Sequence, residues 1–142
     1  VMGGTAVVDE LMGFLNEVRV GKGEHIIREG QHAEALYFVE SGQLTVQLEP
    51  EGIAPIRVRT AGPGTLVGAA GVFMDAAHNQ QLASVVATEP ATVYRLTTTE
   101  LQRMRTEAPK TALLFHEFIV QYMAERLRRT ARIVESLTAY DS

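Results

Sequence analysis

Residues 62–87 read GPGTLVGAAGVFMDAAHNQQLASVVA, and this stretch decides how the rest of the chain is interpreted. It opens with a glycine–proline–glycine turn and then passes through a short apolar segment into the small residues Gly68, Ala69, Ala70 and Gly71. A polar break over residues 75–81 follows, and the alternating run 83–87 closes the stretch. A small-residue bend that leads into one turn of helix leaves backbone N–H groups pointing into open space, which predicts a cradle for an anion.

The composition indicates one globular domain over residues 1–142. Hydrophobic residues make up 46% of the 142 positions, which is enough for a single core. The chain has no cysteine, and its four histidines lack ligand spacing, so we predict neither a disulfide nor a metal site. The net charge of -4 argues against nucleic acid as a partner, because phosphate binding needs a basic surface. No apolar run reaches the length needed to span a bilayer.

The residues before the stretch change from helical to strand periodicity. Apolar positions recur at helical spacing over residues 7–18, which predicts an amphipathic helix within an N-terminal segment 1–22. From residue 23 to 97, short alternating runs are separated by glycine-rich turns, which is typical of a β-barrel or sandwich. The clearest strand candidates in this region are residues 25–28, 36–40, 43–48, 56–60 and 92–96.

The C-terminal segment, residues 98–142, predicts two helices. The first runs from Thr98 or Thr99 to Met104, and the second runs from Pro109 to about Leu137. Along the second helix, a 3-4 spacing is sustained for three to four heptads, which predicts a seam for pairing with a second copy of the chain. The seam residues are Leu113, His116, Val120, Met123, Leu127, Thr130, Val134 and Leu137.

Several motifs occur in the order found in cyclic-nucleotide-binding domains. Residues 28–33 (REGQHA) and 36–42 (LYFVESG) resemble the family's early strand, glycine bend and hairpin. Residues 62–64, 67–68 and 83–87 fall where the family's phosphate-binding cassette begins and ends. The resemblance implies an α+β, mainly β fold. This is an eight-stranded antiparallel β-roll, or jelly roll, with an N-terminal helix, a short cassette helix and a long C-terminal helix.

The same resemblance assigns three cassette positions. In the family an acid binds the ribose 2′-hydroxyl, an arginine pairs with the cyclic phosphate, and a serine or threonine adds a hydrogen bond. These roles fall on Ala69, Gln81 and Leu82, none of which matches the family's side chain. The predicted ligand-binding residues of this degenerate cassette are Gly68, Ala69, Ala70, Gly71, Gln81, Leu82 and Ala83. We therefore expect the fold to be kept and classical cAMP or cGMP binding to be lost or weak, while the backbone N–H groups of residues 68–71 remain available to a weaker anion.

The predicted function is a cytoplasmic regulatory module that senses a ligand or partner and dimerises through the last helix. Residues 114–118 and 124–127 resemble the cytosolic C-terminal tail of bacterial SulP-type sulfate and anion permeases, which implies attachment to STAS and transmembrane domains. A genuine cyclic-nucleotide sensor with an atypical cassette and a purely structural dimerisation domain remain open as alternatives. The glutamates at 24, 29, 34 and 40 accompany no nucleophile or apolar pocket, so we predict no enzyme.

Overall fold

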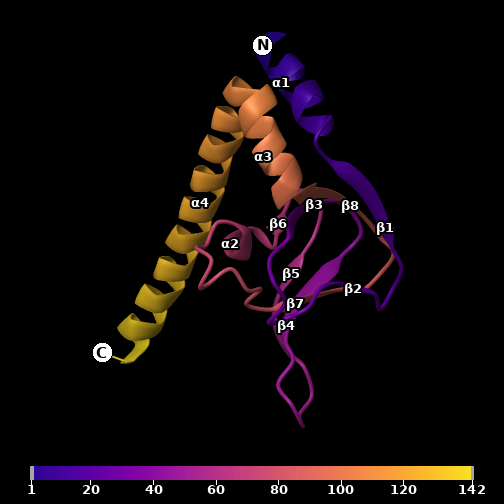
Figure 1. Cartoon of the computed structure of the whole chain (residues 1–142). Coiled ribbons are helices and arrows are strands. Elements are labelled where there is room, and N and C mark those ends of the chain that lie inside the picture. The colour runs from indigo at the N-terminus through magenta and orange to yellow at the C-terminus, as the bar shows by residue number, and fades with distance from the viewer. Residues whose placement is uncertain (1, 142) are drawn as a thin grey trace. The chain divides into compact units, whose positions relative to one another are not determined.

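The computed structural model describes residues 2–141 and the side chains of residues 6–138. These residues confirm the predicted α+β roll of eight antiparallel strands with an N-terminal, a short and a long C-terminal helix (Figure 1). In chain order the elements are α1 (Met2–Met12), β1 (Asn16–Val20), β2 (His25–Ile27), β3 (Ala35–Ser41), β4 (Leu44–Leu48), β5 (Ile56–Ala61), β6 (Leu66–Val67), α2 (Ala69–Val72), β7 (Ser84–Ala87), β8 (Ala91–Thr97), α3 (Thr98–Glu107) and α4 (Pro109–Asp141).

The strands form two four-stranded sheets, in the orders β1-β8-β3-β6 and β2-β7-β4-β5. Buried side chains from both sheets make one core, which includes Tyr37, Val39, Leu44, Val85 and Val93. Successive side chains of a strand point to opposite faces, so residues two apart along β3 or β8 share the inner face. The core therefore fixes which positions of each strand can line the interior of the roll.

The N-terminal helix is shorter than the sequence predicts. α1 ends at Met12, so the helix expected over residues 7–18 is wrong beyond that residue. Residues Asn16–Val20 instead form β1, which pairs with β8. Gly13 weakens helix continuation, because glycine costs about 1 kcal/mol relative to alanine inside a helix. The backbone groups of β8 then offer the following residues a non-local set of hydrogen bonds.

The bend at Gly68 and the short helix after it form as predicted. Gly68 has a φ of 82°, in the left-handed region, and α2 begins at the next residue. A Cβ atom added to Gly68 would lie 2.8 Å from Ile27 Cδ1 and 3.2 Å from the Ala35 carbonyl oxygen. This position therefore requires glycine both for its backbone conformation and for space.

The described chain forms two compact units, one ending at Gln102 and the other beginning at Arg103. The two predicted C-terminal helices are confirmed as α3 and α4, and they extend to Glu107 and Asp141. Pro109 is the first residue of α4, where its missing N–H breaks no helical hydrogen bond. The assignment of the whole chain to a single domain remains a prediction.

The apolar seam predicted on α4 lies mostly in solvent. Four members that recur every seven residues, Leu113, Val120, Leu127 and Val134, are each at least 56% exposed. His116 is half-buried, and its Nε2 accepts a hydrogen bond of 3.2 Å from Arg105 Nε. Burial and the nearby Arg105 charge lower the pKa of His116, so the imidazole is held in its neutral form.

Candidate functional site

A cavity of about 160 Å³ lies in the first unit, between the inner faces of β2, β3 and β8. Its apolar wall consists of Ile26, Ile27 and Ala35. Its polar wall consists of Gln31, His32, Glu34, Tyr37, Gln81 and Arg95. The residues come from five separate segments of the chain, so only the closed roll brings them together.

Arg95 is the cationic group of this cavity that no other described residue compensates. It lies in β8, which runs between β1 and β3, and it pairs with Asn16 on one side and Tyr37 on the other. Val93, two residues before it, is fully buried in the core, so Arg95 shares the inner face of the strand. The Nε atom of Arg95 is shielded from solvent and has no hydrogen-bond partner among the described residues. Arg95 therefore lines the cavity without an ion pair to a described residue, while its Nε is shielded from the cavity's solvent.

Gln81 is the one residue of the predicted ligand set that lines the cavity. Its side chain is only 8% exposed, and its Nε2 would lie 3.5 Å from a Cβ atom added at Gly68. Two backbone hydrogen bonds of 2.8 Å fix its position. The Gly30 N–H donates to the Gln81 carbonyl oxygen, and the Gln81 N–H donates to the Gln31 carbonyl oxygen. The amide is therefore held at the cavity by a rigid backbone.

The other predicted ligand residues lie around the cavity without forming its wall. Ala69 and Gly71 are buried in α2, and Ala70 is half-buried beside them. Ala83 is half-buried and packs against the core. Leu82 is 73% exposed, so its side chain points away from the interior of the roll. Among the family's three anchor positions, only position 81 therefore reaches the cavity, and it carries an uncharged amide.

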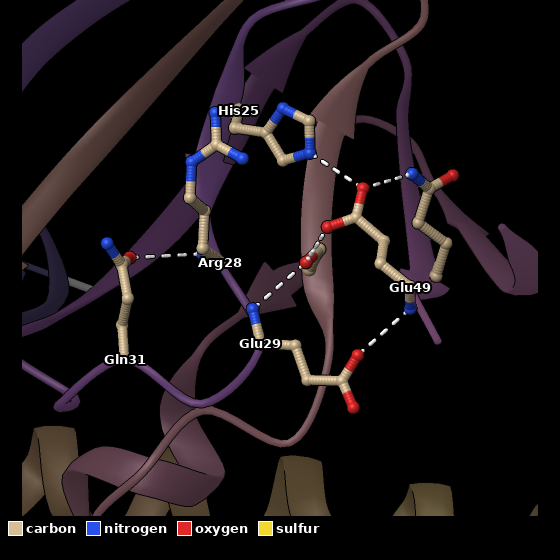
Figure 2. Close-up of polar contacts among 7 residues, drawn as sticks. His25, Arg28, Glu29, Gln31 and Glu49 are labelled. Atoms are coloured by element: carbon tan, nitrogen blue, oxygen red, sulfur yellow. Dashed lines mark hydrogen bonds and ion pairs between the residues drawn. The ribbon is translucent and has the colours of Figure 1, made fainter. Parts of the chain in front are cut away.

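A polar network braces the loop that carries Gln31 (Figure 2). Glu49 accepts hydrogen bonds from the buried Ser84 hydroxyl and from Gln47 Nε2, and it pairs with His25 Nε2 at 2.8 Å. The Glu29 N–H donates to Ser84 Oγ at 2.9 Å, and the Glu49 N–H donates to Glu29 Oε1 at 2.9 Å. These bonds connect β2, β4 and β7 below the cavity.

The hydrogen bonds of this network stabilise the Glu49 carboxylate and hold neighbouring segments together. The Ser84 hydroxyl hydrogen bond, followed by the His25 hydrogen bond, lowers the pKa of Glu49 to about 2, despite an opposing effect of burial. Ser84 and His25 both contact Glu49, and no hydrogen bond joins them to each other in the described chain. A serine nucleophile needs a base within hydrogen-bond reach, so this arrangement lacks the geometry of a catalytic triad.

Arg95 is not among the site residues predicted from the sequence, because it lies outside the cassette, 14 positions after Gln81. A usable signal was present in residues 92–96, where strand alternation places Val93 and Arg95 on the same face. An arginine on the apolar register of a strand predicts a charge inside the roll. Its proximity to Gln81, 14 positions earlier in the chain, depends on the tertiary fold.

Metal-ion clusters and membrane-spanning helices are both absent from the described part of the chain. The side chains of residues 6–138 include no group of three or more histidine, aspartate or glutamate residues placed to hold a metal ion. Over the same residues, α4 and the other helices lack the combination of length and apolar character required to cross a bilayer.

The comparisons with known proteins establish the family. A family profile described as "Cyclic nucleotide-binding domain" matches residues 17–107, which is more than half of the chain. The chain therefore belongs to the cyclic nucleotide-binding domain family, as the motifs of residues 28–42 and 62–87 indicate. No curated protein matches the sequence.

Solved structures share the fold at low sequence identity. The Catabolite Activator Protein of Thermus thermophilus has a TM-score of 0.74 and 22% identity, and the match covers 94% of this chain and 59% of that protein. A cyclic nucleotide-binding domain from Methylobacillus flagellatus has a TM-score of 0.79 and 18% identity, over 87% of this chain and 68% of that one. The sensor domain of the transcriptional regulator DNR from Pseudomonas aeruginosa has a TM-score of 0.64 and 20% identity, over 87% and 81%. At these identities the likeness shows the fold alone.

Proposed function

We propose that this chain is a regulatory sensor module of the cyclic nucleotide-binding domain family that no longer uses a cyclic nucleotide as its effector. The observation that carries the proposal is the chemistry of the three anchor positions. Ala69 is a buried methyl group, Gln81 is an uncharged amide at the cavity, and Leu82 points into solvent. The names of similar structures, which include a catabolite activator and a transcriptional regulator's sensor domain, support a regulatory role.

The loss of affinity for cAMP can be estimated from the missing contacts. A hydrogen bond to a charged group contributes roughly 1.5–3 kcal/mol. Without the family's arginine and acid, binding is weaker by roughly 3–6 kcal/mol, or about two to four decades in Kd. A Kd for cAMP in the micromolar range would thereby rise to the millimolar range or beyond.

Calorimetric titration with cAMP and cGMP tests the proposal. The wild-type chain is expected to show no binding at micromolar concentration. The variant Gln81→Arg places a guanidinium at the cavity and is expected to bind cAMP at least tenfold more tightly than the wild type. Micromolar binding by the wild type that is abolished by Ala69→Trp would instead identify a true cyclic-nucleotide sensor with an atypical cassette.

Homodimerisation through α4 is the second part of the proposed function. Its support is the seam of apolar side chains that repeats every seven residues and lies in solvent, with Leu127 at 71% exposure. Such a row is typical of helices that pair with a second copy. In sedimentation experiments, Leu127→Asp is expected to weaken the dimer at least tenfold. Gln121→Asp, an exposed charge change outside the seam, serves as the control. A dimer that survives Leu127→Asp, or a wild-type monomer, contradicts this proposal.

The attachment to a SulP-type permease also remains a proposal, supported by the resemblance of residues 114–118 and 124–127. A basic cluster that includes Arg128 and Arg129 would suit the acidic surface of a membrane. These two arginines already lie 3.7 and 3.8 Å from Glu125, which equally suits an ordinary solvated helix face. The sequence upstream of Val1 tests the attachment, since the proposal requires apolar helices and a STAS-like segment there.

A further inference from the structure

We infer that the cavity of the roll binds a small organic monocarboxylate, and that Arg95 of β8, in place of a cassette side chain, is its anion anchor. This inference rests on the proposed sensor function and names the class of its ligand. It places the recognition of charge on the opposite sheet from β7, the strand that closes the cassette, because β8 and β7 belong to different sheets.

The first argument is the state of the Arg95 guanidinium. Its Nε lies in the interior without a hydrogen-bond partner among the described residues. No ion pair joins Arg95 to Glu34, the acidic residue of the cavity wall, in the described chain. Shielded polar groups in native proteins are nearly always paired, and an unpaired one calls for a specific explanation. Nε itself is shielded, so an anionic ligand in the cavity would be bound by the terminal N–H groups of this guanidinium, which carries its charge without an ion pair.

The second argument is size. Ligand cavities for nucleotide-sized molecules measure about 300–1,000 Å³, whereas this cavity measures about 160 Å³. At a water's share of about 30 Å³, it has room for about five water-sized groups. This matches a carboxylate with a tail of two or three carbon atoms. The accessible surface of the cavity is mainly polar, so Ile26, Ile27 and Ala35 offer a short tail only a small hydrophobic contact.

The third argument is the shape and sign of the charge. A guanidinium presents parallel N–H donors that match the two oxygens of a carboxylate. The neighbouring Gln81 amide can donate a further hydrogen bond, and its backbone is fixed by two hydrogen bonds. Glu34 adds a negative charge to the cavity wall. One arginine beside one glutamate favours a monoanion over a dianion such as hydrogen phosphate.

The experiment titrates sodium propionate into the full chain at constant ionic strength, with inorganic phosphate and cAMP as parallel ligands. Binding is followed by calorimetry and by the ¹⁵N NMR signal of the Arg95 Nε–H, which reports on the wild-type protein directly. The variants are Arg95→Met, Arg95→Lys and, as a matched control, Arg57→Met. Arg57 is an exposed arginine on β5, outside the cavity wall.

The expected result is saturable binding of propionate to the wild type, with a shift of the Arg95 Nε–H signal. Arg95→Met should lose roughly 10- to 100-fold in affinity, as removal of a charge-assisted hydrogen bond predicts. Arg95→Lys should retain part of the affinity, and Arg57→Met should retain all of it. In the absence of ligand, Arg95→Met should also have a higher Tm than the wild type, because it removes an unpaired shielded group.

Two results would overturn the inference. One is propionate binding that is equal in the wild type and Arg95→Met. The other is an Arg95 Nε–H signal that stays unmoved at millimolar propionate. Either result leaves the proposed sensor function standing if cAMP also fails to bind. Micromolar cAMP binding refutes the proposed function, whatever propionate does, so the two failures are distinguishable.

Discussion

Replacing Glu49 by glutamine should remove an acid-sensitive contribution to the stability of the roll. The Glu49 carboxylate receives the Ser84 hydroxyl and Gln47 amide and pairs with His25. These contacts hold its pKa at about 2, below the ordinary value of 4.5. Because the folded-state pKa is depressed, this contribution is fully present above about pH 4.5. It is lost as the pH falls toward 2.

The size of the effect follows from the pKa difference between the unfolded and folded states. A difference of 4.5 minus about 2 corresponds to at most about 3 kcal/mol, at 1.36 kcal/mol per pKa unit. The Glu49 side chain is 27% exposed, and solvent screening reduces this upper limit to about 1–2 kcal/mol. At about pH 3, which lies between the two pKa values, more than half of the contribution is already lost.

The assay is urea unfolding followed by far-UV circular dichroism, since the chain has no tryptophan to report by fluorescence. Between about pH 7 and pH 3 the wild type should lose about 1 kcal/mol more free energy of unfolding than Glu49→Gln. Glu51→Gln is the matched control. It lies two residues away on the same hairpin, is exposed, and has no ion pair or hydrogen bond to a described side chain.

Equal pH dependence in the wild type and Glu49→Gln would refute this reasoning. So would a Glu51→Gln variant that loses the pH dependence as fully as Glu49→Gln. In the first case the network of Figure 2 would contribute no charge-dependent stability. In the second, the effect would come from the net charge of the hairpin instead of the contacts of one carboxylate.

Two further predictions concern backbone space and a histidine. Gly42→Ala should cost about 2–5 kcal/mol, because it combines a left-handed φ of 86° with an added Cβ only 2.4 Å from the Pro90 carbonyl oxygen. Gly52→Ala, at a φ of 77° with open space around it, should cost only about 1–2 kcal/mol; equal costs by urea unfolding would exclude the steric explanation. The lowered pKa of His116 predicts that the helical unit loses stability as the pH falls below about 6.5, because protonation opposes the Arg105 hydrogen bond. A His116→Gln variant should lose this dependence, and unchanged thermal melts between about pH 7.5 and pH 5.5 in the wild type would contradict the prediction.

The parts of the fold that the sequence predicted are those set by local periodicity. β3 is rich in aromatic and β-branched residues, the sequences of β4 and β8 alternate, and the single turn of α2 follows directly from the bend at Gly68. The prediction of a helix over residues 7–18 was wrong in its second half, because pairing with β8 determines the structure of those residues. That partner lies more than 70 positions later in the chain, so a periodicity taken over a short window cannot include it.

The residues of the candidate site also divide into those that the local sequence predicts and those that only the tertiary fold brings together. Position 81 could be assigned from the motif that surrounds it, and the structure places its amide in the cavity wall. Arg95 could be recognised as an inward charge from the alternation of β8. Its place in the same cavity wall as Gln81 could not be foreseen, because Gln81 lies in the loop before β7 and only the closed roll brings that loop to β8.

By itself, the sequence determined the family and the roll, and it predicted a cassette without charged anchors. These properties depend on residue types at short spacings, which alternation, helical periodicity and turn residues record locally. Only the tertiary structure decided that Leu82 faces solvent, and that Arg95 and Gln81 line the same small cavity. Closure of the roll determines these neighbours, because it brings together strands that are distant in the chain and fixes which face of each strand is inside.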